Sequence, residues 1–431
     1  MLDVAGKKVI VVGLGVSGIA ACRLLVSRGA SVVGTDAKST VPPIEGVELV
    51  LGGHASLEDA DLVVVSPGVP MFPELAAALA RGVRVWGEIE LGVQALTHPA
   101  PVVAIGGTNG KSTTTTLVGE LLAASGKRVF VGGNLGEPLA AHADEPFDVV
   151  VLEVSSFQME RVESFRPAVS VLLNVSADHL DRYESAAEYA RAKGNAFGRQ
   201  TEDDVAVVPF KDPVCLAQAL RGQGRVLTFG TGGTIDVRDD AIVDGEEVYL
   251  RSEIAVQGGH NALNVAAALA AVRPFSVPPA IVRQVLGSFA GLAHRMAFVR
   301  ERAGVRFYDD SKGTNVGAAV TAVLGIAESR VVLVAGGKDK GGSYGPLASA
   351  LRVRGRAAVL IGEAAPLIAE AIGDALPVQR AATMSEAVAA AVKLARPGDA
   401  VLLSPACSSF DMFRDYKDRG DAFVRAVMEL P

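Results

Sequence analysis

Residues 102–118 read VVAIGGTNGKSTTTTLV, and this stretch decides the fold of the central part of the chain. Its first four residues are apolar and mostly β-branched, which predicts a buried strand. Three glycines follow within five residues, and Lys111 and Ser112 then open a predicted helix. A strand, a glycine-rich turn and a helix start together predict an anion site, because backbone N–H groups converge there and the helix dipole favours negative charge.

The stretch departs from the standard phosphate-loop pattern at one position. That pattern places a glycine five residues before the glycine of Gly-Lys, where this chain has Ile105. A glycine-rich turn that binds nothing is therefore the alternative to a nucleotide site. If the loop binds a nucleotide, we expect Lys111 to reach the outer phosphates and Ser112 or Thr113 to offer a hydroxyl to Mg²⁺.

The composition is that of a globular enzyme with two or three domains. The chain has 431 residues, of which 49% are hydrophobic and 21% charged. Its net charge of −7 argues against a nucleic-acid surface, and its three cysteines lack metal-ligand spacing, which favours a reducing compartment. No apolar run has the ~18 residues of a membrane helix, and we see no signal peptide. We expect a cytoplasmic monomer without membrane insertion.

Residues 1–96 begin with a dinucleotide-type fingerprint. The predicted strand Lys8–Val12 is followed by Gly-Leu-Gly-Val-Ser-Gly at 13–18, a helical run and a second strand that ends at Asp36. An acid about 20 residues after the glycines suits a ribose contact. The fingerprint predicts a phosphate-bearing ligand at the first helix without saying which one.

Polar residues follow the strands predicted for residues 97–292. Glu153 ends one strand and is either a magnesium ligand or a helix cap, and the nearby Gly-Lys-Ser favours the metal. His179 follows another predicted strand and is a metal ligand, a base or a solvated loop residue. Its place at the same sheet edge as Glu153 favours a role in the same site. For Lys193, which lies on a predicted helix, spacing alone favours a solvated surface position.

Three further features each keep two interpretations. Ser66-Pro67-Gly68 follows a strand and is a ligand loop or a plain proline turn. Asn134 lies in a glycine turn, where a turn residue is favoured over a polar ligand. Asn261 and Asn264 lie three residues apart on one helix face, where they hold a purine edge or cap the helix.

Residues 293–431 repeat the pattern of strands that end in polar turns. In Asp309–Asn315, capping by Asp or Ser explains part of the turn but does not require Lys312, which favours a ligand. The basic loop 336–342 is a phosphate or carboxylate clamp or a solvated loop. We predict an α/β protein of three domains: Rossmann-like at 1–96, a P-loop-type ATPase domain at 97–292 with a mostly parallel sheet plus a small β excursion, and Rossmann-like at 293–431.

The assembled motifs resemble those of the Mur ligases of peptidoglycan synthesis over nearly the whole chain. Three of them, Ser-Pro-Gly-Val-Pro, Ser-Ser-Phe-Gln and Asp-Ser-Lys-Gly-Thr-Asn, are more typical of the D-glutamate-adding branch. The motifs that carry the resemblance start at Ser66 (SPGVP), Gly107 (GTNGKST), Gly133 (GNLG), Glu153 (EVSSFQ), Asn174 (NVSADHLDR), Gly259 (GHNALN), His294 (HR), Asp310 (DSKGTN) and Ser404 (SPACSS).

The resemblance implies an ATP-dependent amide ligase. In that family the terminal carboxylate of UDP-N-acetylmuramoyl-L-alanine attacks the γ-phosphate of ATP and becomes an acyl phosphate. The amine of D-glutamate then attacks the acyl carbon, and phosphate leaves. Mg²⁺ and a lysine at the position of Lys111 neutralise charge on the transferring phosphoryl group.

The resemblance also implies a role for individual residues. The implied catalytic residues are Lys111, Glu153, His179 and Lys193. The implied Mg²⁺ ligands are Ser112, Glu153, His179 and a carbamylated Lys193. ATP contacts are implied for Gly107, Thr108, Asn109, Gly110, Lys111, Ser112, Thr113, Asn264 at the adenine, Arg295 and Asp310. Contacts to the UDP substrate are implied for Leu14, Gly15, Val16, Ser17, Ser66, Pro67, Gly68, Asn134 and Ser155. D-Glutamate contacts are implied for Lys312, Thr314, Lys340, Ser409 and Tyr416.

Three positions depart from the family pattern. Gly106 and Tyr416 stand where relatives often have Thr and Phe, and Asp36-Ala37-Lys38 stands where relatives place Thr-Arg for uracil. The alternatives are a sister ligase that adds another amino acid, a nucleotide-binding regulator without catalysis, and a nicotinamide dehydrogenase. A non-catalytic regulator would be expected to lack Glu153, His179 and Lys193, and all three are present. Only the fingerprint in residues 1–96 favours the dehydrogenase.

Overall fold

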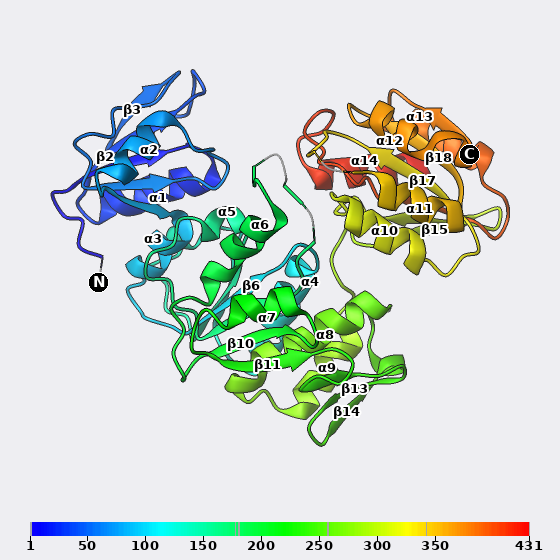
Figure 1. The fold of residues 1–431 in the computed structure, drawn as a ribbon, viewed down its shortest axis with the longest axis horizontal. Helices are drawn as coiled ribbons and strands as arrows, with labels where there is room; N and C mark the ends of the chain where they lie inside the picture. The colour runs from blue at the N-terminus through cyan, green and yellow to red at the C-terminus, as the bar shows by residue number, and fades with distance from the viewer. Residues whose placement is uncertain (1, 177, 180–181, 257, 342, 431) are drawn as a thin grey trace. The chain divides into compact units, whose positions relative to one another are not determined.

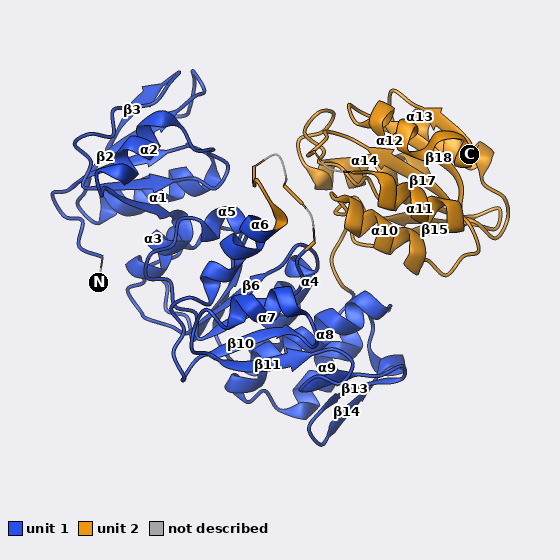
Figure 2. Ribbon diagram, viewed as in Figure 1, with its two compact units in different colours: residues 1–175, 187–290 blue, residues 176–186, 291–431 orange. Residues whose placement is uncertain are grey.

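The computed structural model describes residues 2–176, 178–179, 182–256, 258–341 and 343–430 (Figure 1). They form three separate sheets of five, nine and six strands, each accompanied by helices. The prediction of an α/β protein with three domains is therefore confirmed, whereas the exact domain bounds stay a prediction. The chain divides into two compact units, unit 1 with residues 1–175 and 187–290 and unit 2 with residues 176–186 and 291–431 (Figure 2).

The first sheet is parallel throughout and has the order β3-β2-β1-β4-β5. Because the chain runs from β1 toward β2 and later returns to β4 on the other side of β1, the topological switch point lies between β1 and β4. The elements are β1 (Lys8–Val12), α1 (Val16–Ser27), β2 (Ser31–Asp36), β3 (Val47–Leu51), β4 (Leu62–Val65), α2 (Pro73–Ala80), β5 (Arg84–Gly87) and α3 (Glu88–Ala95).

The glycines of the fingerprint let helix α1 pack against the end of β1. Gly13 has a φ of +88°, a conformation that favours glycine. A Cβ at Gly18 would collide with the carbonyl oxygen of Gly13, so the helix can approach the loop only without a side chain there. Behind this contact, Cys22 and Leu25 of α1 are fully buried in the core.

The central sheet has the order β14-β13-β12-β11-β10-β9-β6-β8-β7. Strands β6 to β12 each pair in parallel with their neighbours in this order, while β12, β13 and β14 pair antiparallel and form the predicted β excursion. The strands are β6 (Val102–Gly106), β7 (Val129–Gly133), β8 (Val149–Glu153), β9 (Val169–Leu172), β10 (Val205–Pro209), β11 (Arg225–Phe229), β12 (Ile235–Val237), β13 (Ala241–Asp244) and β14 (Glu247–Leu250).

Strand β6 lies between β8 and β9 and every one of its residues is buried. Helices α4 and α8 pack together over the sheet, and the alanines of α8 permit their close approach. The helices are α4 (Lys111–Ala124), α5 (Ser156–Met159), α6 (Ala186–Lys193), α7 (Pro213–Ala219), α8 (Gly259–Val272) and α9 (Pro279–Ser288), with 3-10 turns η1 (Leu139–Ala141), η2 (Gly194–Ala196), η3 (Arg251–Glu253) and η4 (Arg273–Phe275).

The third sheet has the order β15-β16-β20-β17-β18-β19, and only its edge strand β15 is antiparallel. Successive residues of β17 enter two different cores, Val332 and Val334 one and Leu333 the other, which explains its continuous apolar sequence. The elements are β15 (Ala297–Arg302), β16 (Val305–Asp309), α10 (Val316–Gly325), β17 (Val331–Gly336), α11 (Gly345–Arg354), β18 (Gly355–Ile361), α12 (Ala365–Ile372), η5 (Gly373–Ala375), β19 (Val378–Arg380), α13 (Met384–Leu394), β20 (Ala400–Leu403) and α14 (Tyr416–Met428).

Helix capping has a different outcome at two positions. In the turn Asp309–Asn315, Oδ1 of Asp309 accepts from the Ser311 N–H at 2.9 Å, so capping by Asp explains part of the turn, while Asn315 caps α10 by accepting from the Ala318 N–H. Glu153 does not cap a helix, so the alternative to a metal ligand does not hold there. Ser155 and Gln158 form a capping box at the start of α5 instead, so the backbone groups there are already satisfied.

Among the described residues, no helix combines the length and the apolar character that crossing a bilayer requires.

We expect Gly18→Ala to lower the free energy of unfolding by about 1–3 kcal/mol, because the added methyl group has no room beside Gly13. Urea unfolding of unit 1 measures the change. Gly287→Ala in the exposed part of α9 is the matched control, since its Cβ would meet nothing nearer than 3.6 Å and alanine favours the helix by about 1 kcal/mol. Equal effects of the two substitutions would contradict the packing argument.

Candidate functional site

The loop between β6 and α4 is fastened to the end of strand β9. The N–H of Thr108 donates to the carbonyl of Asn174 (3.0 Å), and the Asn174 amide exchanges two hydrogen bonds with the backbone of Asn109 (2.9 and 3.0 Å). Gly107 and Gly110 have φ values of +147° and +86°, which side-chain-bearing residues rarely adopt. Gly110 is the N-cap of α4 and supplies no side chain to it, so a ligand can accept from the first N–H groups of the helix.

Two lysines converge on this loop. The Lys111 ammonium donates to the carbonyls of Gly107 and Thr108, each at 2.9 Å. The Lys193 ammonium donates to the same Gly107 carbonyl, also at 2.9 Å. Both positive charges therefore lie at the glycine-rich loop before α4, which suits a phosphate group.

Lys193 is buried, so the interpretation as a solvated surface residue is wrong. Only 5% of the residue is exposed, and its ammonium lies 4.4 Å from the ring centre of Tyr189, one helical turn earlier on α6. Spacing on α6 could not reveal this, because the face of a helix that a sheet covers depends on residues distant in the chain. Its burial beside the phosphate loop is what the family resemblance implies for a functional lysine.

Glu153 presents a carboxylate oxygen that no hydrogen bond uses. Its residue is 3% exposed, and Cα of Glu153 is paired in register with Ile105 of β6, next to the loop. Oε1 accepts from Nδ2 of Asn134 at 2.7 Å, whereas Oε2 has no hydrogen-bond partner within the described part of the chain. A buried carboxylate oxygen left open in this way fits a divalent cation ligand.

Asn134 has a role that neither of its two interpretations included, since it binds Glu153. Its backbone N–H donates to the Glu153 carbonyl (2.9 Å) and its side chain orients the Glu153 carboxylate. The preceding Gly133 has a φ of +93°, and a Cβ there would lie 2.6 Å from the Glu153 carbonyl oxygen. The glycine turn therefore brings Asn134 against Glu153, while its contact with the UDP substrate stays a prediction.

Asn264 lies directly against the phosphate loop. A Cβ at Gly110 would collide with its Oδ1 atom, and its Nδ2 donates to Oδ1 of Asn261 at 3.3 Å. Because Gly258 is the N-cap of α8 and no side chain of the described residues caps this helix, the capping interpretation of the two amides is wrong. Their place beside Gly110 is compatible with the purine edge that the sequence suggested.

His179 belongs to unit 2, so its approach to Glu153 and Lys193 stays a prediction. It has a φ of +55°, and its Nε2 lies 3.7 Å from Oδ2 of Asp178. The same Asp178 oxygen accepts from Nδ2 of Asn315 at 3.4 Å, which joins the loop to the start of α10. Ala177, Leu180 and Asp181 of this motif lie outside the described residues.

Unit 2 brings together most residues of the predicted amino-acid site. The Lys312 ammonium donates to the Tyr416 hydroxyl (3.3 Å) and lies 4.6 Å from the centre of its ring. The Thr314 N–H donates to the Lys312 carbonyl at 2.9 Å. An antiparallel bridge between Lys338 and Ser408 sets the loop that bears Lys340 alongside the loop that bears Ser409. Gly342 of the basic loop lies outside the described residues.

Arg295 and Asp310 also meet in unit 2. Arg295 Nη1 lies 3.8 Å from Oδ1 of Asp310, and Oδ2 of Asp310 accepts from the Ser404 hydroxyl at 2.8 Å. Burial raises the pKa of Asp310 to about 6, against the lowering effect of Arg295 and Ser404. The Asp310–Ser404 hydrogen bond links the loop after β16 to the loop after β20, and the contact of Arg295 and Asp310 with ATP stays a prediction.

The predicted UDP loops meet at the switch point of the first sheet. The Ser66 hydroxyl donates to the Gly13 carbonyl at 2.6 Å, which joins the loop after β4 to the loop after β1. The Asp36 carboxylate accepts from the N–H groups of Leu14 (2.7 Å) and Lys38 (2.8 Å). The acid that the fingerprint assigns to a ribose therefore also shapes the loop that would hold the phosphates.

Family models cover all three sheets. Residues 7–87 match the MurD-like N-terminal domain of Mur ligases, residues 105–272 the Mur ligase middle domain, and residues 294–407 the Mur ligase glutamate ligase domain. The chain belongs to the Mur ligase family. This family is the one that its motifs resemble.

Full-length relatives agree with that assignment. The chain is 42% identical to the UDP-N-acetylmuramoylalanine–D-glutamate ligase of Syntrophotalea carbinolica and 45% identical to that of Geotalea uraniireducens. Each alignment covers 100% of this chain and 99% of the relative. Among solved structures, a pseudomurein peptide ligase type C from Methanothermus fervidus has a TM-score of 0.65 at 19% identity, covering 98% of this chain and 100% of that one. The MurC structure from Thermotoga maritima has a TM-score of 0.61 at 21% identity, covering 98% and 99%.

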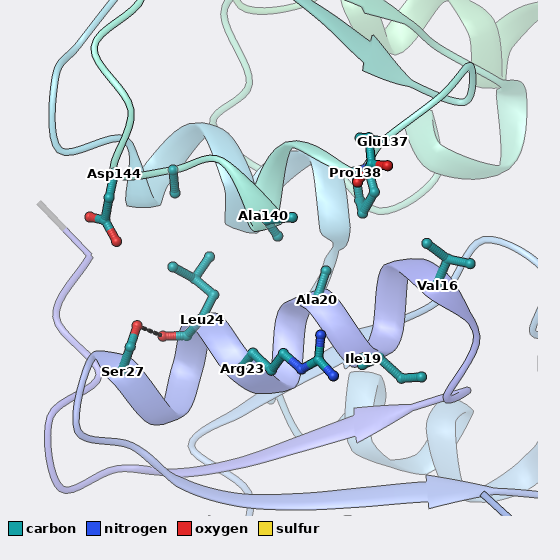
Figure 3. A pocket seen from close by; sticks show the side chains of 12 residues that line it. Val16, Ile19, Ala20, Arg23, Leu24, Ser27, Glu137, Pro138, Ala140 and Asp144 are labelled. Atoms are coloured by element: carbon teal, nitrogen blue, oxygen red, sulfur yellow. Dashed lines mark hydrogen bonds between the residues drawn. The ribbon is translucent and has the colours of Figure 1, made fainter. Parts of the chain in front are cut away.

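A pocket of about 520 Å³ lies within unit 1 between α1 and residues 137–144 (Figure 3). Val16 and Arg23 of α1 line one side, and Glu137 and Asp144 line the other. Of the residues that the Mur ligase resemblance assigns to the UDP substrate, only Val16 is among those that line it. The pocket is therefore adjacent to the predicted substrate loops and not identical with them.

Glu88 of α3 binds the segment that lines one side of this pocket, and nothing in the sequence pattern indicated it. Its Oε1 accepts from the Ala140 N–H in η1 at 2.8 Å, while Oε2 has no hydrogen-bond partner among the described residues. Burial raises its pKa to about 7, against the lowering effect of the amides of Ala140 and Leu139. An ionised Glu88 therefore costs free energy in the folded protein.

The raised pKa makes stability depend on pH. Because the folded state holds the Glu88 proton more tightly, this group's contribution is complete below pH ~4.5 and is lost as the pH rises through about 7. We expect Glu88→Gln to reduce the fall in thermal midpoint between pH 5.5 and pH 8. The exposed Glu48→Gln is the control and should keep the wild-type pH dependence. An unchanged pH dependence in Glu88→Gln would contradict the assignment.

Proposed function

We infer that this chain uses ATP to add D-glutamate to UDP-N-acetylmuramoyl-L-alanine in peptidoglycan synthesis, forming ADP and phosphate. The observation that carries the inference is 42–45% identity over the full length of relatives that bear this activity in their name. Together with the Mur ligase middle and glutamate ligase domains, these relatives support an ADP-forming ligase. We expect it in the cytoplasm, as a monomer.

ATP fits the loop that ends at Gly110. The ammonium group of Lys111 provides positive charge for its phosphates, and the start of α4, whose N-cap is a glycine, provides N–H donors. Asn264 lies beside Gly110, where we place the adenine. The MurF ligase from Thermotoga maritima, which has a similar fold at 20% identity and a TM-score of 0.63, was solved in complex with ADP.

The donor set of unit 1 fits Mg²⁺. Glu153 offers its unpartnered Oε2, and Ser112 offers a hydroxyl from the first turn of α4. Carbamylation of Lys193 would turn its cation into a further carboxylate-like ligand, and we place His179 in the same set. When bound, Mg²⁺ neutralises charge between the phosphoryl group and the substrate carboxylate.

The reaction then follows from where the charges lie. A substrate carboxylate oxygen attacks the γ-phosphorus, the bond to the ADP oxygen breaks, and an acyl phosphate forms. Two anions must approach for this step, and Lys111 reduces their repulsion because its ammonium is held at the loop. The D-glutamate amine then attacks the acyl carbon, an amide bond forms, and phosphate leaves with the electron pair of the broken C–O bond.

We place D-glutamate in unit 2. Lys312 supplies a cation for its carboxylates beside Tyr416, with Thr314, Lys340 and Ser409 on the neighbouring loops. Arg295 and Asp310 would face ATP. The UDP substrate would occupy the edge of the first sheet, in contact with Leu14, Gly15, Val16, Ser17, Ser66, Pro67, Gly68, Asn134 and Ser155.

We expect ADP formation to require both UDP-N-acetylmuramoyl-L-alanine and D-glutamate. The rate should fall by about 100-fold or more with L-lysine, glycine or L-alanine, because their side chains leave the cation of Lys312 without a second carboxylate. A coupled ADP assay with each amino acid at equal concentration measures this. Equal rates with any of these amino acids, or with none, would refute D-glutamate as the substrate.

We expect Lys193→Ala to lower kcat by about 100-fold or more, because a metal ligand is lost. Lys193→Arg should also be inactive, since arginine keeps the positive charge but cannot carry the carbamate. Added acetate should restore part of the activity of Lys193→Ala only, because a small carboxylate can occupy the vacated space. An active Lys193→Arg would show that the cation alone suffices and would refute carbamylation.

A further inference from the structure

Arg419 is a fully buried arginine in the first turn of α14. Its exposed fraction is 0%, and it is among the largest side chains in the core of the described protein. None of the motifs that indicate ligand binding includes it. A buried guanidinium is costly unless its N–H groups are satisfied, so its partners indicate what it does.

Its guanidinium makes four hydrogen bonds to two loops. Nε donates to the Ser311 hydroxyl (3.0 Å) and Nη2 donates to the Ser311 carbonyl (2.8 Å). Nη1 donates to the carbonyls of Cys407 (3.1 Å) and Ser408 (3.2 Å). One rigid fork therefore spans the loop after β16 and the loop after β20.

The residues next to these contacts are those assigned to D-glutamate. Ser311 precedes Lys312, and Ser408 precedes Ser409. The Ser311 hydroxyl also donates to the Tyr416 carbonyl at 2.7 Å, so the first turn of α14 is tied to the same point. Strands β16 and β20 pair side by side and set the bases of these loops, and the Ser404–Asp310 and Ala406–Gly313 hydrogen bonds also join them. Arg419 adds a further link beyond the strand ends, at the residues next to Lys312 and Ser409.

The loop after β17, which carries Lys340, lies against the same Arg419 guanidinium. A Cβ at Gly337 would lie 3.2 Å from Nη1 of Arg419 and would collide with the Ser408 carbonyl oxygen. Gly337 has a φ of +133°, and the next residue, Lys338, exchanges hydrogen bonds with Ser408 (3.0 and 3.2 Å). The loop that carries Lys340 is thus in register with the loop that Arg419 holds.

The chemistry of this position selects arginine and not lysine. Burial lowers the pKa of Arg419 to about 10, so the group stays charged at neutral pH. Among the described residues, no carboxylate oxygen lies within ion-pair distance of it, and carbonyl and hydroxyl oxygens are its hydrogen-bond acceptors. The side chain therefore serves as a planar multi-donor link, which an ammonium group cannot reproduce.

We propose that Arg419 is a positioning residue for the amino-acid substrate, and that it sets the distance between Lys312 and Ser409. It touches no reacting atom and acts through the two loops. The proposal rests on the proposed function, because it takes D-glutamate to be the ligand of these loops. It assigns part of the affinity for D-glutamate to a side chain in the core.

The test compares Arg419→Lys with wild type and with Arg425→Lys, an exposed arginine on the same helix. Steady-state kinetics give KM for D-glutamate, KM for ATP and kcat, and circular dichroism confirms folding. We expect Arg419→Lys to raise KM for D-glutamate by about tenfold or more, because displaced loops bind the substrate poorly. KM for ATP should stay within about twofold, and Arg425→Lys should match wild type.

Ser311→Ala provides a second variant that removes only one acceptor of the fork. It should raise KM for D-glutamate in the same direction by a smaller factor, and it decides the matter if Arg419→Lys does not fold. An unchanged KM for D-glutamate in a folded variant, or equal changes in all three parameters, would overturn the proposal. A wild-type protein that forms no ADP with D-glutamate would refute the proposed function instead.

Discussion

The carbonyl oxygen of Gly107 accepts hydrogen bonds from two lysine ammonium groups, and the central site depends on this contact. Lys111 lies four residues further along the chain, whereas Lys193 reaches the same oxygen from a helix 86 residues away. Two cations at one carbonyl repel each other unless an anion lies nearby. The arrangement therefore suits an anionic ligand, although the loop lacks the glycine of the standard phosphate-loop pattern at Ile105.

All three sheets place polar residues where parallel strands end. At each edge a side chain joins two loops: Ser66 bonds Gly13 in the first sheet, Asn134 bonds Glu153 in the second, and Arg419 bonds Ser311 in the third. Loops at such an edge would otherwise be free to separate, since the strands below fix only their bases. These links hold the residues that we predict to bind ligands at defined positions on rigid scaffolds.

The local part of this organisation could be predicted from the sequence. The apolar runs that became β1, β4, β6, β10 and β20 are short and bounded by glycine or proline, so their strand character follows from pattern alone. Three exposed or partly exposed edge strands, β3, β15 and β19, were not predicted, because they are short or carry charged residues. The helix caps at Ser155 and Asn315 could also be misjudged, since several capping residues stand close together there.

The sequence by itself determined the three α/β domains, the glycine-rich loop before α4 and the place of Glu153 at the end of a strand. Strands, glycine turns and helix starts depend on neighbours in the chain. Only the tertiary structure decided that Lys193 is buried, that Asn134 orients Glu153, and that Arg419 joins two loops. The physical reason is the same in each case. These contacts join residues that are far apart in the sequence. The packing of helices against sheets decides which oxygen atom accepts a hydrogen bond from a buried cation or amide.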